Sequence, residues 1–196
     1  MKAVSLHARG ARLAVVLAAA LLAACSSPPP ATFDLGSAPR PSGVGDVGRT
    51  AVAQPTAVLL VDSDRIIVRS PGNQVAYLPG AQWPDRLPNL FMARLVQSFE
   101  NASKSRQVSR AGDRIVPVYQ LNTDIRTFEV RTDTREAVVE ITARLVADRT
   151  GDVGAARMFS ARVAVSEITG PAAAIGLDAA AQQVMAEIVR WVAARS

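Results

Sequence analysis

The sequence predicts an α+β fold: a two-layer domain in which an antiparallel sheet has two main helices packed on one face. Three observations support this prediction. Two segments carry apolar residues at helical spacing, several others alternate apolar and polar residues as strands do, and short turns join the later strands. Because one strand face is polar and needs no cover, both helices are expected on the apolar face.

The first residues are typical of an export signal. The apolar run from Leu13 to Ala24 is shorter than the roughly 20 residues of a membrane span, and basic residues without any acid precede it. The run ends in LAAC, which resembles the lipobox of bacterial lipoproteins, and Cys25 is the only cysteine. The resemblance implies diacylglycerol on the Cys25 sulfur, cleavage before it and acylation of the new N-terminus. The alternative is an ordinary signal peptide with an incidental cysteine.

These features divide the chain into a signal peptide at residues 1–24, a lipid-anchored tether at 25–31 and a single domain at 32–196. The prolines of the tether keep it extended at roughly 3 Å per residue. The folded domain is therefore expected to stay within about 20 Å of its anchor.

Composition excludes most catalytic chemistry. The predicted signal holds His7, the only histidine, and three of the 22 basic residues but none of the 17 acidic ones, which leaves a net charge of +2. What remains has no histidine for a catalytic triad or a zinc site, and Lys104 is its one lysine. We therefore predict no enzyme, no cofactor and no metal. Without a dense basic run, we also predict no nucleic-acid partner.

In the first half of the domain, turn signals separate short strands from one helix. Strands are expected at 32–35 and 49–53, and a hairpin at 65–78 around a Ser-Pro-Gly-Asn turn. A Pro-rich connection then leads into a helix over about 87–102, where apolar residues recur three and four positions apart.

The second half predicts a meander and a closing helix. Residues 119–127 alternate so that one strand face is polar, and the phase slips at 128–130, which indicates a bulge. Two further strands have their core faces within 137–145 and 159–165, and the loops between them are short. An apolar stripe predicts the last helix over about 175–194.

Several of these segments together resemble the ABC-type transport auxiliary lipoproteins, which include the paraquat-inducible protein C group. The resemblance rests on the opening PPATFDL, the segment 62–100 with its Trp-Pro turn, the strand segments YQLNTDIRTFEV and AVVEITARLVADRTGDVGAARMFSA, and the final helix AAAQQVMAEIVRWVA. It covers nearly all of the chain after the signal. At the opening, Phe33 stands where the family usually has tyrosine.

The resemblance implies a non-enzymatic component of an ABC system that moves lipids or organic solutes with a mammalian-cell-entry (MCE) protein, which would be the partner. It also implies a periplasmic domain anchored in the inner leaflet of the outer membrane. Cys25 is followed directly by Ser26 and Ser27 and not by an aspartate, which is the usual signal for retention in the inner membrane. The outer membrane is therefore expected. A homo-oligomer stays open. The alternative function is a structural outer-membrane lipoprotein that positions or activates a cell-envelope assembly enzyme.

Three residues are candidates for the partner surface: Trp83, Asp124 and Arg126. Exposed aromatic residues favour interfaces, and Asp124 and Arg126 share the polar strand face. The alternatives are that Trp83 packs over the first helix, and that Asp124 and Arg126 form a solvated surface pair. Arg65 and Arg69 also share a strand face, where guanidinium groups suit a lipid phosphate.

Overall fold

The structure, a computed structural model, describes residues 29–37, 39–45, 47–102, 108–113 and 116–195. The predicted signal peptide and Cys25 lie outside the described residues. The elements follow one another as β1 (Ala31–Thr32), β2 (Thr50–Val52), β3 (Thr56–Ala57), β4 (Arg65–Ser70), the 3-10 turn η1 (Pro71–Asn73), β5 (Gln74–Gln82), α2 (Leu87–Ala102), β6 (Val108–Arg110), β7 (Tyr119–Arg131), β8 (Glu136–Ala147), β9 (Val153–Ala164) and α3 (Gly170–Ala193).

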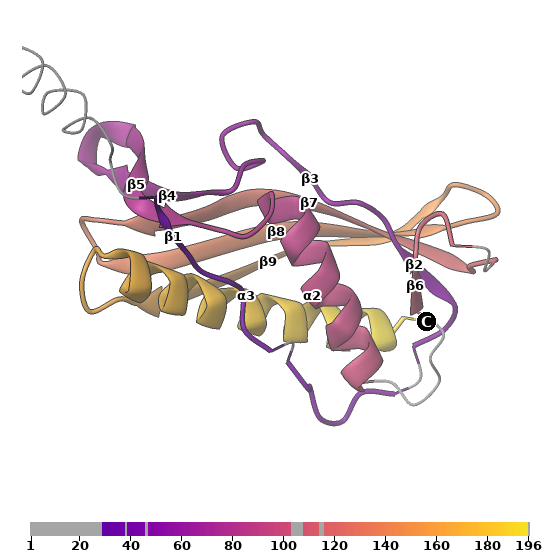
Figure 1. Cartoon of the computed structure of the whole chain (residues 1–196). Coiled ribbons are helices and arrows are strands. Elements are labelled where there is room, and N and C mark those ends of the chain that lie inside the picture. The colour runs from indigo at the N-terminus through magenta and orange to yellow at the C-terminus, as the bar shows by residue number, and fades with distance from the viewer. Residues whose placement is uncertain (1–28, 38, 46, 103–107, 114–115, 196) are drawn as a thin grey trace, which may run out of the picture.

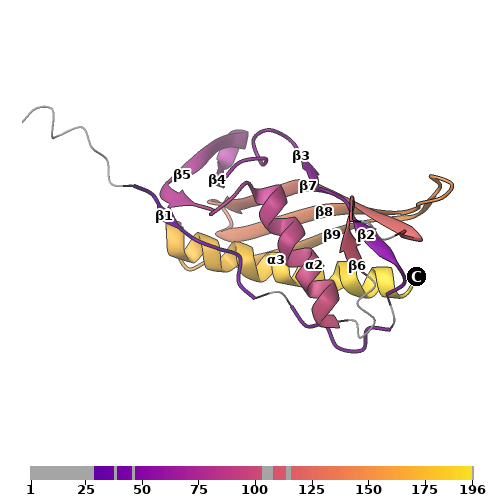
Figure 2. The ribbon, with the colours of Figure 1, turned by 45° about the vertical axis from the view of Figure 1, so that its right-hand side comes forward.

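One curved sheet carries both helices on the same face (Figure 1). The long helix α3 packs along β8 and β9, and α2 crosses α3 and reaches β6 (Figure 2). The opposite face of the sheet, called the outer face below, carries neither helix. The predicted two-layer α+β architecture is confirmed.

Strand β7 is the spine of the sheet. Along one edge it pairs antiparallel with β8, which pairs antiparallel with β9, so the predicted meander is confirmed. Along the other edge β2, β3 and β4 pair with it one after another, all in parallel. The sheet is therefore mixed, which corrects the expectation of an antiparallel sheet. Parallel pairing needs a long crossover connection, and the chain from β5 through α2 to β6 supplies it.

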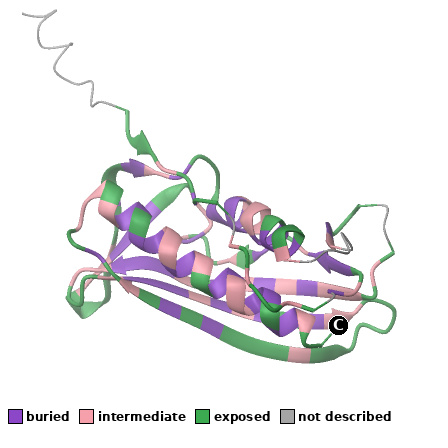
Figure 3. Cartoon of the chain, turned by 90° about the horizontal axis from the view of Figure 1, so that it is seen from below, coloured by how far each residue is buried: buried purple, intermediate pink, exposed green. Residues whose placement is uncertain are grey.

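The apolar stripes of the helices and strands meet in one core. α2 has the predicted bounds and buries Leu87, Leu90, Phe91, Leu95 and Phe99. Buried residues recur along both helices between exposed ones (Figure 3). The predicted core face of β8 is fully buried against the helix layer, from Ala137 to Leu145 at every second residue. This core is built from the residues that the sequence pattern selects.

Two elements are longer than predicted. β5 continues past the predicted hairpin end at residue 78 to Gln82, where it gains β1 as a parallel neighbour. α3 begins at Gly170, five residues before the predicted start. The reason is Pro171, which lies in the first turn of α3, where its missing N–H would have no partner anyway.

The segment that follows β1 contacts both helices. Leu35 is buried, and the Gly36 N–H donates to Oδ1 of Asp178 on α3 at 2.8 Å. On α2, Arg94 pairs with Asp34 at 2.6 Å. The predicted strand at 32–35 is therefore a strand only at Ala31–Thr32, and beyond it the segment is fixed by contacts to both helices.

Candidate partner-binding surface

Trp83 lies in the core, with only 1% of its surface exposed. Its ring meets Phe128 of β7 edge-on, with centroids 6.0 Å apart. The backbone N–H of Trp83 donates to the Asp64 carbonyl at 2.7 Å. The buried ring presents no surface to a partner. This corrects the partner-facing placement of Trp83. The side chain packs inward, as the alternative had it, and its ring contact is with Phe128 of β7.

Asp124 and Arg126 do lie side by side, on the outer face of β7. The register of β7 against β8 shifts between Ile125 and Thr127, so Arg126 is the extra residue of a bulge. This bulge falls two residues before the predicted one. The Arg126 side chain points toward Asp124, and its Nε lies 3.5 Å from Oδ2 of Asp124. The same Nε donates to Oγ1 of Thr142 at 3.0 Å. The carboxylate and guanidinium are thus held in place on an exposed strand surface.

Exposed apolar side chains lie beside this pair. The turn after β3 carries Val58 and Leu59, with 63% and 88% of their surface exposed, and it rises from the sheet on the side away from the helices (Figure 1). β3 itself pairs with β7 at Asp124 and Ile125. Met158, 59% exposed, pairs with Thr142 on the outer face. We call Val58, Leu59, Asp124, Arg126 and Met158 the outer patch.

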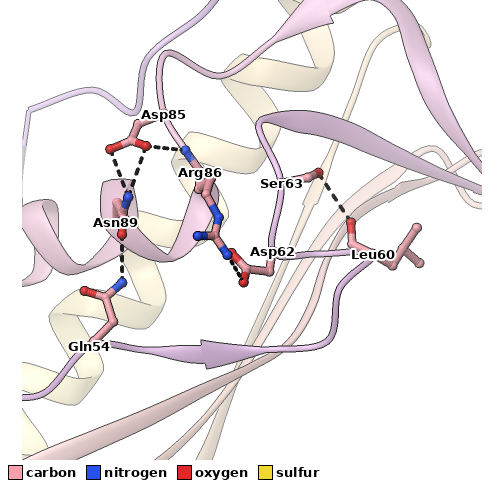
Figure 4. A network of polar contacts seen from close by, with 7 residues as sticks. All are labelled: Gln54, Leu60, Asp62, Ser63, Asp85, Arg86 and Asn89. Carbon is pink, nitrogen blue, oxygen red and sulfur yellow. Dashed lines mark hydrogen bonds and ion pairs between the residues drawn. The ribbon is translucent and has the colours of Figure 1, made fainter.

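A polar network fixes the turn that carries Val58 and Leu59. Arg86 pairs with Asp62 of this turn, and Asp85 accepts from the Arg86 N–H at 2.6 Å and from the Asn89 amide at 3.1 Å (Figure 4). Gln54, which precedes β3, donates to Asn89 at 2.8 Å. The network joins both sides of the turn to the start of α2. The two apolar side chains therefore project from a fixed turn.

Sequence reasoning missed Val58 and Leu59. The available signal was the apolar run AVLLV at 57–61, but an apolar run by itself predicts burial in a strand. Val61 of the same run is buried and Leu60 is half-buried, so the run is split between core and solvent. Only the path of the turn shows which of these residues face outward.

Arg65 and Arg69 are engaged by different partners. The Arg65 guanidinium lies over the Tyr77 ring, 5.2 Å from its centroid. Arg69 donates through Nε to the buried Glu129 carboxylate at 2.6 Å, and this hydrogen bond raises the pKa of Arg69 against the opposing effect of desolvation. Nε of Arg131 is 3.6 Å from the same carboxylate. Arg69 therefore neutralises a buried carboxylate instead of pairing with Arg65 at a phosphate.

The described part of the chain has neither a cluster of metal ligands nor a helix that could span a membrane. Across residues 29–37, 39–45, 47–102, 108–113 and 116–195, no three His, Cys, Asp or Glu side chains are placed to hold a metal ion. None of the described helices is long and apolar enough to cross a membrane.

Solved structures of similar fold are known. A crystal structure from Xanthomonas campestris has a TM-score of 0.74 with 26% sequence identity, over 84% of this chain and 94% of that one. The PelC dodecamer from Paraburkholderia phytofirmans has a TM-score of 0.50 with 15% identity, over 80% of this chain and 95% of that one. At such low identity, PelC shows similarity of fold alone.

Sequence comparisons define the family. An uncharacterized protein of Bradyrhizobium diazoefficiens is 31% identical over 166 residues, which are 82% of this chain and 44% of that protein. This chain thus spans less than half the length of that relative. The model of the ABC-type transport auxiliary lipoprotein component matches residues 33–189, from the segment after β1 to the last turns of α3. The chain therefore belongs to the ABC-type transport auxiliary lipoprotein family.

Proposed function

We propose that the protein is a non-enzymatic, lipid-anchored periplasmic component of an ABC system, and that it docks an MCE-type protein of that system. The observation that carries this proposal is the family match over residues 33–189. The anchor would be Cys25, at the inner leaflet of the outer membrane. The transported class would be lipids or other organic solutes.

The outer patch supports docking through an exposed protein surface. It combines exposed apolar side chains with a held ion pair, and interfaces commonly combine apolar contacts with polar ones. The ion pair itself contributes less than about 1 kcal/mol to folding because it is exposed. Asp124 and Arg126 are therefore better suited to orient a partner than to stabilise the domain.

The polar lining of two surface hollows supports the docking of a protein partner and argues against the enclosure of a lipid. The hollow of about 330 Å³ beside the β4–β5 turn is lined by Arg69, Glu129, Arg131 and other polar residues. A second hollow, of about 540 Å³ between the segment after β1 and α2, is lined by Arg40, Arg94 and further polar side chains. Pockets for lipid chains are lined mainly by apolar residues.

Site-specific crosslinking in cells tests the proposal. A photoreactive amino acid at Leu59 of the outer patch should crosslink to an MCE-type protein, identified by mass spectrometry. The matched control is Ile175, an apolar residue of α3 with 71% of its surface exposed, which lies in the helix layer. No crosslink is expected from Ile175.

Three outcomes would contradict the proposal. Crosslinks to the MCE protein from Ile175 but not from Leu59 would place the interface at the start of α3 and not on the outer patch. Stoichiometric phospholipid in the purified protein, without any MCE partner, would make it a lipid carrier. Recovery of a cell-envelope assembly enzyme in place of the MCE protein would support the alternative of a structural lipoprotein.

A further inference from the structure

A hollow at the C-terminal end of α3 is lined by three arginines and one glutamate, and it is separate from the outer patch. We propose that this hollow binds an acidic peptide segment of the docked protein partner. The inference rests on the proposed function, since it supplies a second contact for the same partner. The hollow has a volume of about 410 Å³ and is lined by Arg157, Glu187, Arg190, Trp191, Ala194 and Arg195.

The hollow and β1 lie at opposite ends of α3. At the start of the helix, a Cβ added to Gly170 would come within 3.1 Å of the Phe33 ring, just after β1. The helix then runs for 24 residues, which at 1.5 Å per residue is about 35 Å. Figures 1 and 2 show β1 and the last turns of α3 at opposite ends of the molecule. The hollow therefore lies far from β1, into which the predicted tether leads.

Two of the three arginines rest on a rigid aromatic base. Phe159 of β9 and Trp191 of α3 are both buried, and their rings meet edge-on with centroids 5.6 Å apart. The Arg157 guanidinium lies 4.8 Å from the Phe159 centroid, and that of Arg195 lies 5.1 Å from the Trp191 centroid. Stacking on a ring orients a guanidinium and leaves N–H groups at its edge for an anion. Nη1 of Arg195 already donates to the Trp191 carbonyl at 3.2 Å, so this arginine offers its remaining N–H groups.

The charge of the hollow is unbalanced. Three guanidinium groups face one carboxylate, Glu187, which lies 3.7 Å from Arg157. Both side chains of that pair are about half exposed, so the pair is weak and can exchange for a better partner. Among the described residues, no carboxylate lies within ion-pairing distance of Arg190. Charge complementarity therefore favours an anionic ligand.

A carboxylate-bearing peptide fits these groups better than a membrane surface does. Planar guanidinium groups bind carboxylates with two parallel hydrogen bonds, and a phosphate offers the same possibility. A lipid headgroup, however, would have to reach a site at the end of the domain remote from the tether. A protein partner that docks on the domain has no such constraint, so its acidic segment is the favoured ligand.

Fluorescence anisotropy tests the proposal with a fluorescein-labelled hexaglutamate peptide as the probe and the full-length protein in neutral detergent. Saturable binding is expected at low ionic strength and should weaken as salt is added. Arg157→Gln and Arg190→Gln should each raise the dissociation constant of the peptide about tenfold, as expected for loss of a charge-assisted hydrogen bond. Arg144→Gln is the matched control, because Arg144 is an exposed residue of β8 outside the hollow. It should change the dissociation constant less than about twofold, since distant sites act independently.

Three results would overturn the proposal. One is that the peptide binds no better than a neutral hexaglutamine peptide. Another is that Arg144→Gln weakens binding as much as the two hollow variants do, which would mean diffuse attraction. The third is that water-soluble short-chain phosphatidylglycerol binds the hollow more tightly than the peptide, which would make it a lipid site. A crosslink from Leu59 to the MCE protein would survive any of these results, so failure here is distinguishable from failure of the proposed function.

Discussion

The tight packing around Gly176 of α3 predicts the effect of adding one methyl group there. A Cβ at this position would come 2.4 Å from Cγ1 of Val165 and 3.1 Å from Cβ of Ala137. Gly176→Ala improves helix propensity by about 0.5–1 kcal/mol, but forcing extra volume into a packed core costs about 1–3 kcal/mol. The clash is with a branched, buried side chain, so the steric cost wins. We expect a net loss of about 1–2 kcal/mol in the free energy of unfolding.

A double-mutant cycle isolates the cause. Val165→Ala removes the clashing methyl and by itself should cost about 2 kcal/mol in lost burial and cavity formation. In the double variant, the new methyl of residue 176 occupies part of the vacated space. The double variant should therefore be more stable than the sum of the single effects predicts, by about 1 kcal/mol or more.

Urea unfolding of the chain from Ser26 onward measures the four free energies of this cycle. The midpoints should shift while the slopes stay constant, because the surface exposed on unfolding hardly changes. A Gly176→Ala variant more stable than the parent would refute the reasoning, since propensity would then outweigh packing. Strict additivity of the two substitutions would refute it as well, because the steric contact would then carry no energy.

Two further predictions concern the buried carboxylate and the anchor. Arg69→Ala should destabilise the domain by about 2 kcal/mol, because it removes a charge-assisted hydrogen bond from the buried Glu129. Arg131→Ala should cost less, because Nε of Arg131 lies 3.6 Å from the Glu129 carboxylate. Urea unfolding measures both losses of stability, and equal losses would contradict this reasoning. Cys25→Ser should abolish acylation and leave uncleaved precursor or unanchored protein. Metabolic labelling with a clickable fatty acid measures the acylation, and label on the serine variant would exclude Cys25 as the attachment site.

Much of the local structure follows from the sequence because burial has a period. The stripe that predicts a helix at 87–102 is the buried stripe of α2, and the alternation within 137–145 is the core face of β8. The closing helix is found by the same signal, although its first turn is hidden by Gly170 and Pro171, which are commonly read as a loop. In each case the decisive interactions lie within one element or between one element and solvent.

Only the tertiary structure decided which strands pair and which side chains meet. The periodicity of β2, β3 and β4 does not encode that they line β7 in parallel, since period 2 is common to both orientations. Nor does a Trp-Pro turn encode that Trp83 packs against Phe128. Arg157 and Arg190 lie on different elements, and only the packing of α3 on β9 brings them to one hollow. Sequence pattern specifies the buried side of an element, whereas contacts between distant residues depend on how all the elements pack together.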